Sequence, residues 1–306
     1  MSPLKTVPET VEAVIGLGAR RARTPAGRLL LASVLAGLYI SFGGALALRA
    51  GGGIPPEWGS AGRLVFAGVF PLGLLLVVFG GAALFTGDVM YVAGGILGGR
   101  VGAGEGLRAL ALSWLGNLAG ALGLAWLIHR AGIYLEGGSA AAPAPLALYA
   151  VRLGAAKCSQ GFWTLFVKGI LCNQLVCLAV FMSLSARDGI SKAALVWPPV
   201  FGFVALGMEH SVANMFFIPA GILAGADPGY LAAPGAAAPT YGWCDFLTRN
   251  LVPVTLGNVA GGALFVAAPY CLAFRDAPGT GAGAGPPAGC AGRAPGPGRR
   301  GGAGNA

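Results

Sequence analysis

Two groups of polar residues interrupt long apolar stretches of this sequence, and they are the first candidates for chemistry. One group begins at Thr86, within the apolar stretch 64–98, and the other begins at Glu209 and His210, within 192–224. Burying an ionisable side chain is costly unless it is paired or used. Histidine is the side chain that exchanges a proton near neutral pH, so His210 with its acidic neighbour predicts a proton-handling site. A histidine that only packs against its neighbours is the alternative.

Three amides and two lysines add to this polar set. Asn173, Asn214 and Asn258 lie in otherwise apolar stretches, where each must find a hydrogen-bond partner. They are expected either to orient the histidine and the interruptions or simply to hold helices together. Lys157 is placed in an outer funnel, where it would attract anions, although a surface lysine with a buried stem accounts for it and for Lys168 equally well.

The composition predicts that these residues lie in a membrane protein. Hydrophobic residues make up 56% of the 306 positions and charged residues only 10%, against about 25% charged in a soluble domain. The 54 glycines also fit closely packed membrane helices. The net charge of +9 comes from short loops and the two ends, so it indicates the positive-inside bias rather than nucleic-acid binding.

The chain divides into three parts. Residues 1–28 are predicted to form a cytoplasmic amphipathic helix and a basic hinge, 29–274 a six-helix membrane domain, and 275–306 a disordered tail rich in Gly, Ala and Pro. Most of the 20 Lys and Arg fall on the side of both termini, which places both termini in the cytoplasm or its equivalent. No signal peptide is expected, because the first apolar run is long enough to span. The six predicted spans lie near 29–49, 64–98, 107–128, 161–185, 192–224 and 247–273.

An internal repeat relates the two halves of the membrane domain. The third span contains the letters LGNLAG at 115–120 and the sixth contains LGNVAG at 256–261. Each follows an interrupted span, which in turn follows a plain one. Three spans per half imply that the second half is inverted in the membrane, and such repeats place a transport path where their broken helices meet.

The cysteines predict neither a metal site nor a disulfide framework. The six cysteines are scattered, without a CxxC pair or a Cys/His cluster, and are expected to pack as small apolar residues. We expect no cofactor and no enzymatic activity, since neither a nucleophile nor a metal set accompanies Glu209 and His210.

Four stretches resemble the formate/nitrite transporter family: ALFTGDVM, GILCNQLVCLAVFMSLSA, FVALGMEHSVANMFFIPAGI and NLVPVTLGNVAGGALFV. The resemblance covers about residues 8–273. It implies an aquaporin-like protomer, assembled as a homopentamer in the lipid bilayer, with one pore in each protomer. It also departs at Asp88, where relatives often have an uncharged residue, so that a carboxylate stands near an anion path.

The resemblance further implies roles for individual residues. His210, Glu209 and Thr86 would form the pore's proton-relay site, with Lys157, Asn173 and Asn258 around it. The outer hydrophobic constriction would comprise Phe70 and Phe203, and the inner one Leu74, Leu84, Phe85 and Val176.

The predicted function is therefore a channel or transporter for small monovalent weak-acid anions, nitrite or formate first, with proton transfer at the central histidine. Hydrosulfide, acetate and lactate are alternative substrates. A neutral-solute facilitator is less favoured because paired Asn-Pro-Ala motifs are missing at the breaks, and an intramembrane enzyme or a purely structural protein is less favoured still. The Ala/Gly/Pro/Arg-rich composition fits a bacterial plasma membrane, or an algal plasma membrane or plastid envelope.

Overall fold

The predicted all-α class is confirmed. A computed structural model describes residues 4–139 and 141–275. In these ranges all the regular secondary structure is helical, apart from two isolated β-bridges, and there is no strand. The tail predicted for 275–306 lies outside the described residues from 276 onward. The described chain up to Arg275 is one compact unit.

Five helices or helix runs are long and apolar enough to cross a membrane: Ala26–Gly52, Ala61–Gly80, Ala103–Arg130, Phe162–Ser185 and Asp245–Phe274. Three shorter apolar helices accompany them: Phe85–Leu97, Gly189–Ala205 and Ser211–Gly225. In chain order the helices are α1 (Val7–Arg23), α2 (Ala26–Gly52), η1 (Pro56–Trp58), α3 (Ala61–Val69), α4 (Leu72–Gly80), α5 (Phe85–Leu97), α6 (Ala103–Arg130), η2 (Ile133–Leu135), α7 (Pro145–Cys158), α8 (Phe162–Ser185), α9 (Gly189–Ala205), α10 (Ser211–Gly225), α11 (Pro228–Leu231), η3 (Asp245–Leu251), α12 (Val252–Gly262), η4 (Ala263–Ala267) and α13 (Ala268–Phe274).

The two predicted interruptions are real helix breaks. The first separates α4 from α5, and Gly81 ends α4 with a φ of 67°. The second separates α9 from α10 and contains Gly207, with a φ of 68°. Glycine takes up such positive φ values without the clash that other side chains suffer, so each half-helix can stop sharply. Thr86 and His210 lie just beyond these stops.

Helix α7 was not predicted. It begins with Pro145 at its first turn, which suits the start of a helix, and Lys157 lies in its last turn rather than near the start of the following span. The last span also contains two π-helical turns, η3 and η4, which the apolar pattern gives no means of predicting.

Helix α1 lies against the rest of the protein. Thr6 and Glu9 form a capping box, in which the Glu9 side chain accepts from the Thr6 N–H at 2.7 Å and the Thr6 hydroxyl accepts from the Glu9 N–H at 3.3 Å. The buried face of α1 includes Val11, Val14 and Ile15 and packs mainly on α5. The apolar stripe that predicted an interfacial helix is therefore covered by protein.

The two repeated LGNxAG segments lie at the contacts of two closely packed helix pairs. Helix α6 packs along α2, and α12 packs along α8. A Cβ at Gly120 would collide with the backbone oxygen of Val34, and a Cβ at Gly261 would collide with that of Ile170. Glycines four residues apart allow membrane helices to approach this closely, so the repeat has the same packing role in both halves.

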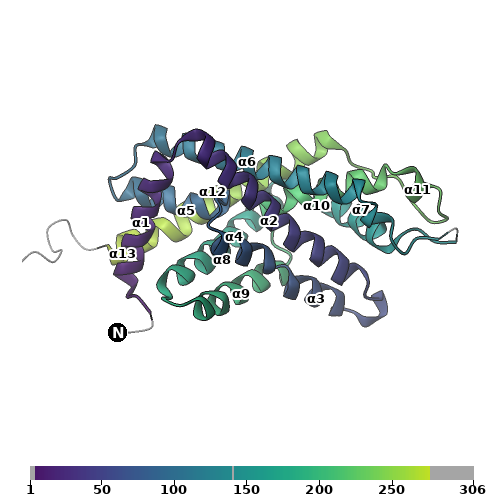
Figure 1. Ribbon diagram of the computed structural model, residues 1–306, viewed down its shortest axis with the longest axis horizontal. Coiled ribbons are helices and arrows are strands. Elements are labelled where there is room, and N and C mark those ends of the chain that lie inside the picture. The colour runs from purple at the N-terminus through teal and green to yellow at the C-terminus, as the bar shows by residue number, and fades with distance from the viewer. Residues whose placement is uncertain (1–3, 140, 276–306) are drawn as a thin grey trace, which may run out of the picture. The chain divides into compact units, whose positions relative to one another are not determined.

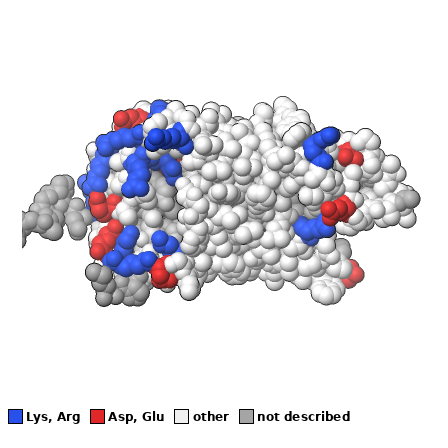
Figure 2. Space-filling view, viewed as in Figure 1, with Lys and Arg blue, Asp and Glu red and all other residues white. Residues whose placement is uncertain are grey.

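In the compact unit up to Arg275, most of the charged side chains on the face drawn in Figure 2 gather at its two ends. Figure 1 shows α1 and α13 at one end and α7 and α11 at the other. On the face drawn in Figure 2, Lys and Arg crowd the α1 end, fewer lie at the α7 end, and an uncharged band separates them. Such a band is what hydrocarbon requires of the surface that it contacts.

Candidate functional site

The two helix breaks meet at Thr86 and His210. The Thr86 hydroxyl oxygen lies 2.9 Å from His210 Nε2, although the residues are 124 positions apart in the chain. Both side chains are buried. Thr86 belongs to the first turn of α5, and His210 is the N-terminal cap of α10.

The hydrogen bonds around His210 define its tautomer. The Ala213 backbone N–H donates to His210 Nδ1 at 3.0 Å, so Nδ1 carries no proton. In the neutral imidazole the proton is therefore on Nε2, which donates it to the Thr86 hydroxyl. The hydroxyl proton of Thr86 then remains available to a further acceptor.

Two asparagines from the repeat hold the two breaks in the same way. Asn117 Oδ1 accepts from the N–H of Phe85, the first residue of α5, at 2.8 Å, and its Nδ2 donates to the carbonyls of Ala83 and Ser33. An unsatisfied backbone group would be costly here, so each amide closes one broken helix.

Asn258 does the same for the second break. Its Oδ1 accepts from the N–H of Ser211, the first residue of α10, at 2.8 Å, and its Nδ2 donates to the carbonyls of Glu209 and Gly169. Asn258 was a predicted site residue. Asn117 was not, although its place in the repeated letters was the signal that identifies it.

Asn173 connects α5 with α12. Its Nδ2 donates to the Thr86 carbonyl at 3.1 Å and to the Asn258 carbonyl at 2.6 Å. Its side chain is fully buried on α8. The predicted amide therefore lies beside Thr86 and steadies the start of α5 against α12.

The Glu209 carboxylate is bound by Lys157 and by one amide, Asn214. Its Oε2 accepts from Lys157 Nζ at 2.9 Å and from Asn214 Nδ2 at 2.6 Å. Asn214 Nδ2 also donates to Asn250 Oδ1 at 2.8 Å, and Asn250 Nδ2 donates to the Lys157 carbonyl at 2.8 Å. Lys157 is thus an ion-pair partner and not a free cation.

Asn250 was missed in the sequence. It lies in the π-helical turn η3, which places its side chain toward Asn214. Its letter opens the stretch NLVPVTLGN, which was the available signal.

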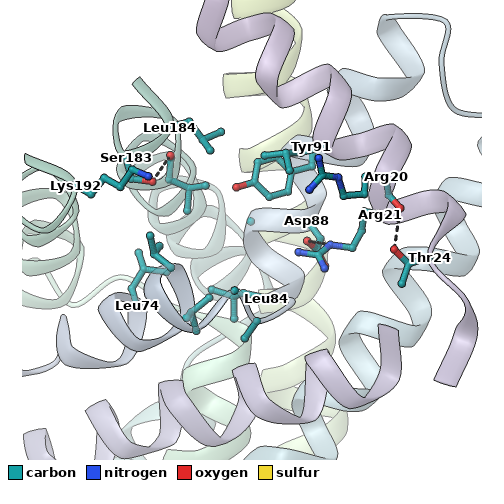
Figure 3. A pocket seen from close by; sticks show the side chains of 17 residues that line it. Arg20, Arg21, Thr24, Leu74, Leu84, Asp88, Tyr91, Ser183, Leu184 and Lys192 are labelled. Carbon is teal, nitrogen blue, oxygen red and sulfur yellow. Dashed lines mark hydrogen bonds and ion pairs between the residues drawn. The ribbon is translucent and has the colours of Figure 1, made fainter. Parts of the chain in front are cut away.

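Two cavities approach the Thr86–His210 pair from opposite ends. The α7 cavity, of about 460 Å³, is bounded by Tyr149, Lys157, Lys168, Phe203 and His210 among others. The α1 cavity, of about 330 Å³, reaches Leu74, Leu84, Gly87 and Asp88 (Figure 3). The Thr86–His210 hydrogen bond therefore joins a wall of one cavity to the chain segment that lines the other.

The predicted outer constriction borders the histidine. The Phe203 ring stacks on the His210 imidazole, with centroids 5.9 Å apart, and Phe70 meets Phe203 edge to face at 6.0 Å. Of the predicted inner set, Leu74 and Leu84 line the α1 cavity, whereas the buried Phe85 and Val176 line neither the α1 cavity nor the α7 cavity.

The Asp88 carboxylate forms an ion pair with Arg21. Arg21 Nε donates to Asp88 Oδ1 at 2.8 Å, and the Ser113 hydroxyl donates to Oδ2 at 2.7 Å. The carboxylate is 1% exposed. Asp88, the residue that departs from the family pattern, is thus paired with a cation from α1. The negative charge that was expected to oppose an anion path is therefore compensated.

The helices are apolar and long enough to cross a membrane, and two broken helices meet at a polar centre with a cavity on each side. These features define a multi-pass membrane protein of the channel class. The formate/nitrite transporter family matches residues 8–272, so the chain belongs to that family. The predicted resemblance is confirmed.

Individual relatives agree. A protein described as a probable formate transporter from Methanothermobacter thermautotrophicus is 39% identical over 287 residues, which covers 89% of this chain and 98% of the relative. The formate channel FocA of Escherichia coli is 37% identical over 251 residues, covering 79% of this chain and 85% of FocA. The nitrite transporter NirC of the same organism is 33% identical over 273 residues, covering 88% and 93%.

Solved structures share the fold. One described as an FNT family ion channel has a TM-score of 0.74 at 30% identity, covering 87% of this chain and 98% of that one. Another, a pentameric formate channel with formate bound, has a TM-score of 0.71 at 32% identity, covering 81% and 96%. These relatives are transporters and channels, not enzymes.

Proposed function

We propose that this protein conducts small monovalent weak-acid anions, nitrite or formate first, and that the anion is neutralised by a proton at the Thr86–His210 pair. The observation that carries the proposal is the buried 2.9 Å hydrogen bond between these residues, with a cavity at either side. The formate and nitrite transport named for the relatives supports the choice of substrate.

Neutralisation is the cheaper way through the apolar rings. The idealised cost of moving a bare ion into a low-dielectric interior is of order 20 kcal/mol. Protonating an acid whose pKa lies roughly three to four units below ambient pH costs only about 4–5 kcal/mol. The neutral acid is therefore selected by two apolar constrictions. One is formed by the side chains of Phe70 and Phe203, and the other by those of Leu74 and Leu84.

The hydrogen bonds of His210 support one route for the proton. A proton arrives at Nδ1 of His210 and displaces the Ala213 N–H, while the Nε2 proton moves to Thr86. The Thr86 hydroxyl proton moves to an oxygen of the anion. One proton enters and one leaves, so the imidazole stays neutral and is left in its other tautomer. Loss of the Nδ1 proton and uptake of one proton at Nε2 return the ring to its first tautomer, which restores the hydrogen bond from Ala213.

The α7 cavity draws the anion toward this pair. Because Lys157 is engaged by Glu209, the attraction comes chiefly from Lys168 and Arg63, which also line the cavity. Lys168 Nζ donates to Gln160 Oε1 at 2.7 Å, and no described carboxylate forms an ion pair with it. Asn214 lines the same cavity, and its buried Oδ1 has no hydrogen-bond partner among the described residues.

The proposed organisation is an inverted repeat of three spans each, in a homopentamer with both termini on the cytoplasmic side. The equivalent hydrogen bonds of Asn117 and Asn258 support the repeat. The pentameric formate channel supports the assembly. Native mass spectrometry of the purified protein tests it, and a dominant species other than five chains would contradict it.

The substrate proposal is tested by stopped-flow uptake into proteoliposomes. Formate, nitrite, acetate, lactate and hydrosulfide are offered across pH, with glycerol as a neutral control. The proposal expects formate and nitrite to lead, and it expects their uptake to carry protons that acidify the lumen. Faster passage of glycerol than of any anion would favour a neutral-solute facilitator instead.

A further inference from the structure

The α1 cavity holds more positive charge than the proposed pathway uses. Three basic side chains line it, Arg20, Arg21 and Lys192, against one carboxylate, Asp88. The ion pair of Arg21 with Asp88 accounts for one cation. Neither Arg20 nor Lys192 has an ion-pair partner among the described residues, so the cavity carries an excess of two positive charges.

The two unpaired cations face the same space from different helices. Figure 3 shows Lys192 on one side of the cavity and the side chains of Arg20 and Arg21 on the other, with Leu74 and Leu84 along one wall. Arg20 comes from α1 and Lys192 from α9. The Tyr91 hydroxyl also belongs to the lining, whereas the Ser183 hydroxyl already donates to the Val180 carbonyl at 2.7 Å. Cations from two elements, with a hydroxyl as a further donor, are the groups that bind an oxyanion.

The size of the cavity fits such a ligand. Its volume of about 330 Å³ is far above the ~10–15 Å³ that a single water needs. An oxyanion with two negative charges balances the excess of two positive charges, whereas a monovalent anion leaves one unmatched.

We propose that the α1 cavity binds a free dianionic oxyanion of the sulfate or phosphate type. The bound dianion rests against Leu74 and Leu84, which line the same cavity. It cannot follow the transported anion across them, because the cost of desolvating an ion rises with the square of its charge. While bound, it therefore closes this end of the pathway. The closing effect rests on the proposed anion conduction; the binding itself does not.

The binding claim is tested by calorimetric titration of sulfate into the full-length protein in detergent. Sulfate keeps two negative charges across the working pH range, and chloride at matched ionic strength is the monovalent control. We expect saturable sulfate binding that weakens at least fivefold in Arg20→Gln and in Lys192→Gln. Arg28→Gln is the matched control, because Arg28 is exposed and does not line the cavity, and it should bind as the parent does.

Three further comparisons keep the binding test decisive. Arg20→Lys should retain sulfate binding, which a general loss of folding would not allow. Equal affinity for sulfate in all variants, or equal binding of chloride, would overturn the proposal. Repeating the titration in nanodiscs with and without phosphatidylglycerol separates a free anion from a lipid headgroup as the ligand. Unchanged sulfate affinity supports a free ligand. Loss of sulfate binding in the anionic lipid would assign the cavity to a headgroup and overturn the proposal.

The closing effect is tested separately by flux. Sulfate on both sides of the proteoliposome membrane should slow formate uptake in the parent and in Arg28→Gln. In Lys192→Gln, an at least fivefold higher sulfate concentration should be needed for the same slowing. Sulfate binding without any slowing of flux would overturn the closing effect alone. If no anion of the panel is conducted, the proposed function fails while the calorimetric result still stands.

Discussion

The Ala213 backbone N–H and the Thr86 hydroxyl hold opposite nitrogens of the His210 ring, at 3.0 Å and 2.9 Å. The first contact is the cap of α10, and the second joins α10 to the first turn of α5. Moving a proton through the ring therefore disturbs the start of a helix. In the proposed function, structure and proton transfer are therefore coupled at one side chain, and variants that change only one of them can separate the two.

Removing a break-closing amide should destabilise the protein without altering any ionisable group. Asn258→Leu would leave the Ser211 N–H and the Glu209 carbonyl without their partner in a buried site. Each buried unpaired group costs about 1–3 kcal/mol, so a loss of several kcal/mol is expected. The measurement is thermal unfolding in detergent, followed by circular dichroism.

Asn117→Leu should cost a similar amount, because it frees the equivalent groups at the first break. Ser159→Ala, at an exposed position, is the control and should change little. Normal stability of either Asn variant would contradict the equivalence of the two breaks.

Breaking the Arg21–Asp88 ion pair should depend strongly on which partner is removed. Arg21→Met leaves a 1% exposed carboxylate without its cation, and such uncompensated burial costs about 3–5 kcal/mol. Asp88→Asn should be milder, because Arg21 is 20% exposed and borders the α1 cavity. Unfolding midpoints in detergent provide the comparison.

The double variant Arg21→Met with Asp88→Asn completes this cycle. It should recover much of the stability that Arg21→Met loses, because no buried charge is left alone. A double variant as unstable as the sum of the two single variants would show that the residues do not act as a pair.

Lys168 and Lys157 should have different effects on conduction. Lys168→Gln removes a cation that no described carboxylate neutralises, so we expect a several-fold higher apparent KM for formate and a weaker dependence on salt. Maximal flux should change little. Initial uptake rates at several ionic strengths provide the measurement.

Lys157→Gln should instead reduce stability, because it leaves Glu209 buried beside Asn214 without its cation. An unchanged KM in Lys168→Gln, with a raised KM and normal folding in Lys157→Gln, would reverse the roles assigned here.

Acid should loosen the start of α1. The pKa of Glu9 lies below its ordinary value of 4.5, chiefly because the Thr6 backbone N–H donates to its carboxylate. A depressed pKa in the folded state contributes stability above pH 4.5 that is lost as pH falls through the lower folded value. Amide hydrogen exchange along α1 should therefore show less protection in Glu9→Gln than in the parent at about pH 6, where the parent carboxylate is ionised.

The same two proteins should become alike at low pH, once the parent carboxyl is protonated. Glu12→Gln is the control, since Glu12 pairs with Arg100 and takes no part in the cap. A difference between parent and Glu9→Gln that persists unchanged at low pH would rule out the carboxylate as its cause.

The helix breaks could be predicted from the sequence because polar residues inside a membrane-length apolar run are costly unless the helix opens around them or uses them. Thr86 and His210 were found in this way, and the repeated letters at Asn258 predicted a second half related to the first. Their meeting point follows from the fold and matches the proposed path.

Partners far apart in the chain were harder to predict. The ion pair of Lys157 with Glu209 depends on α7, a short helix with a weak apolar pattern, and that of Asp88 depends on α1 docking on α5. Asn250 depends on a π-helical turn, whose geometry leaves no periodic mark in the sequence. Each missed contact was set by packing between helices rather than by local residue type.

The central claim, that the anion is neutralised at Thr86 and His210, is tested by proton-coupled uptake in His210→Phe and His210→Asn. Both variants are compared with the parent in proteoliposomes that carry an internal pH dye, after size-exclusion chromatography shows the parental assembly. The account predicts that acid-linked flux of formate and nitrite is abolished in His210→Phe and strongly reduced in His210→Asn, which retains a hydrogen-bonding side chain but no exchangeable imidazole proton. Undiminished acid-linked flux in folded His210→Phe would contradict it.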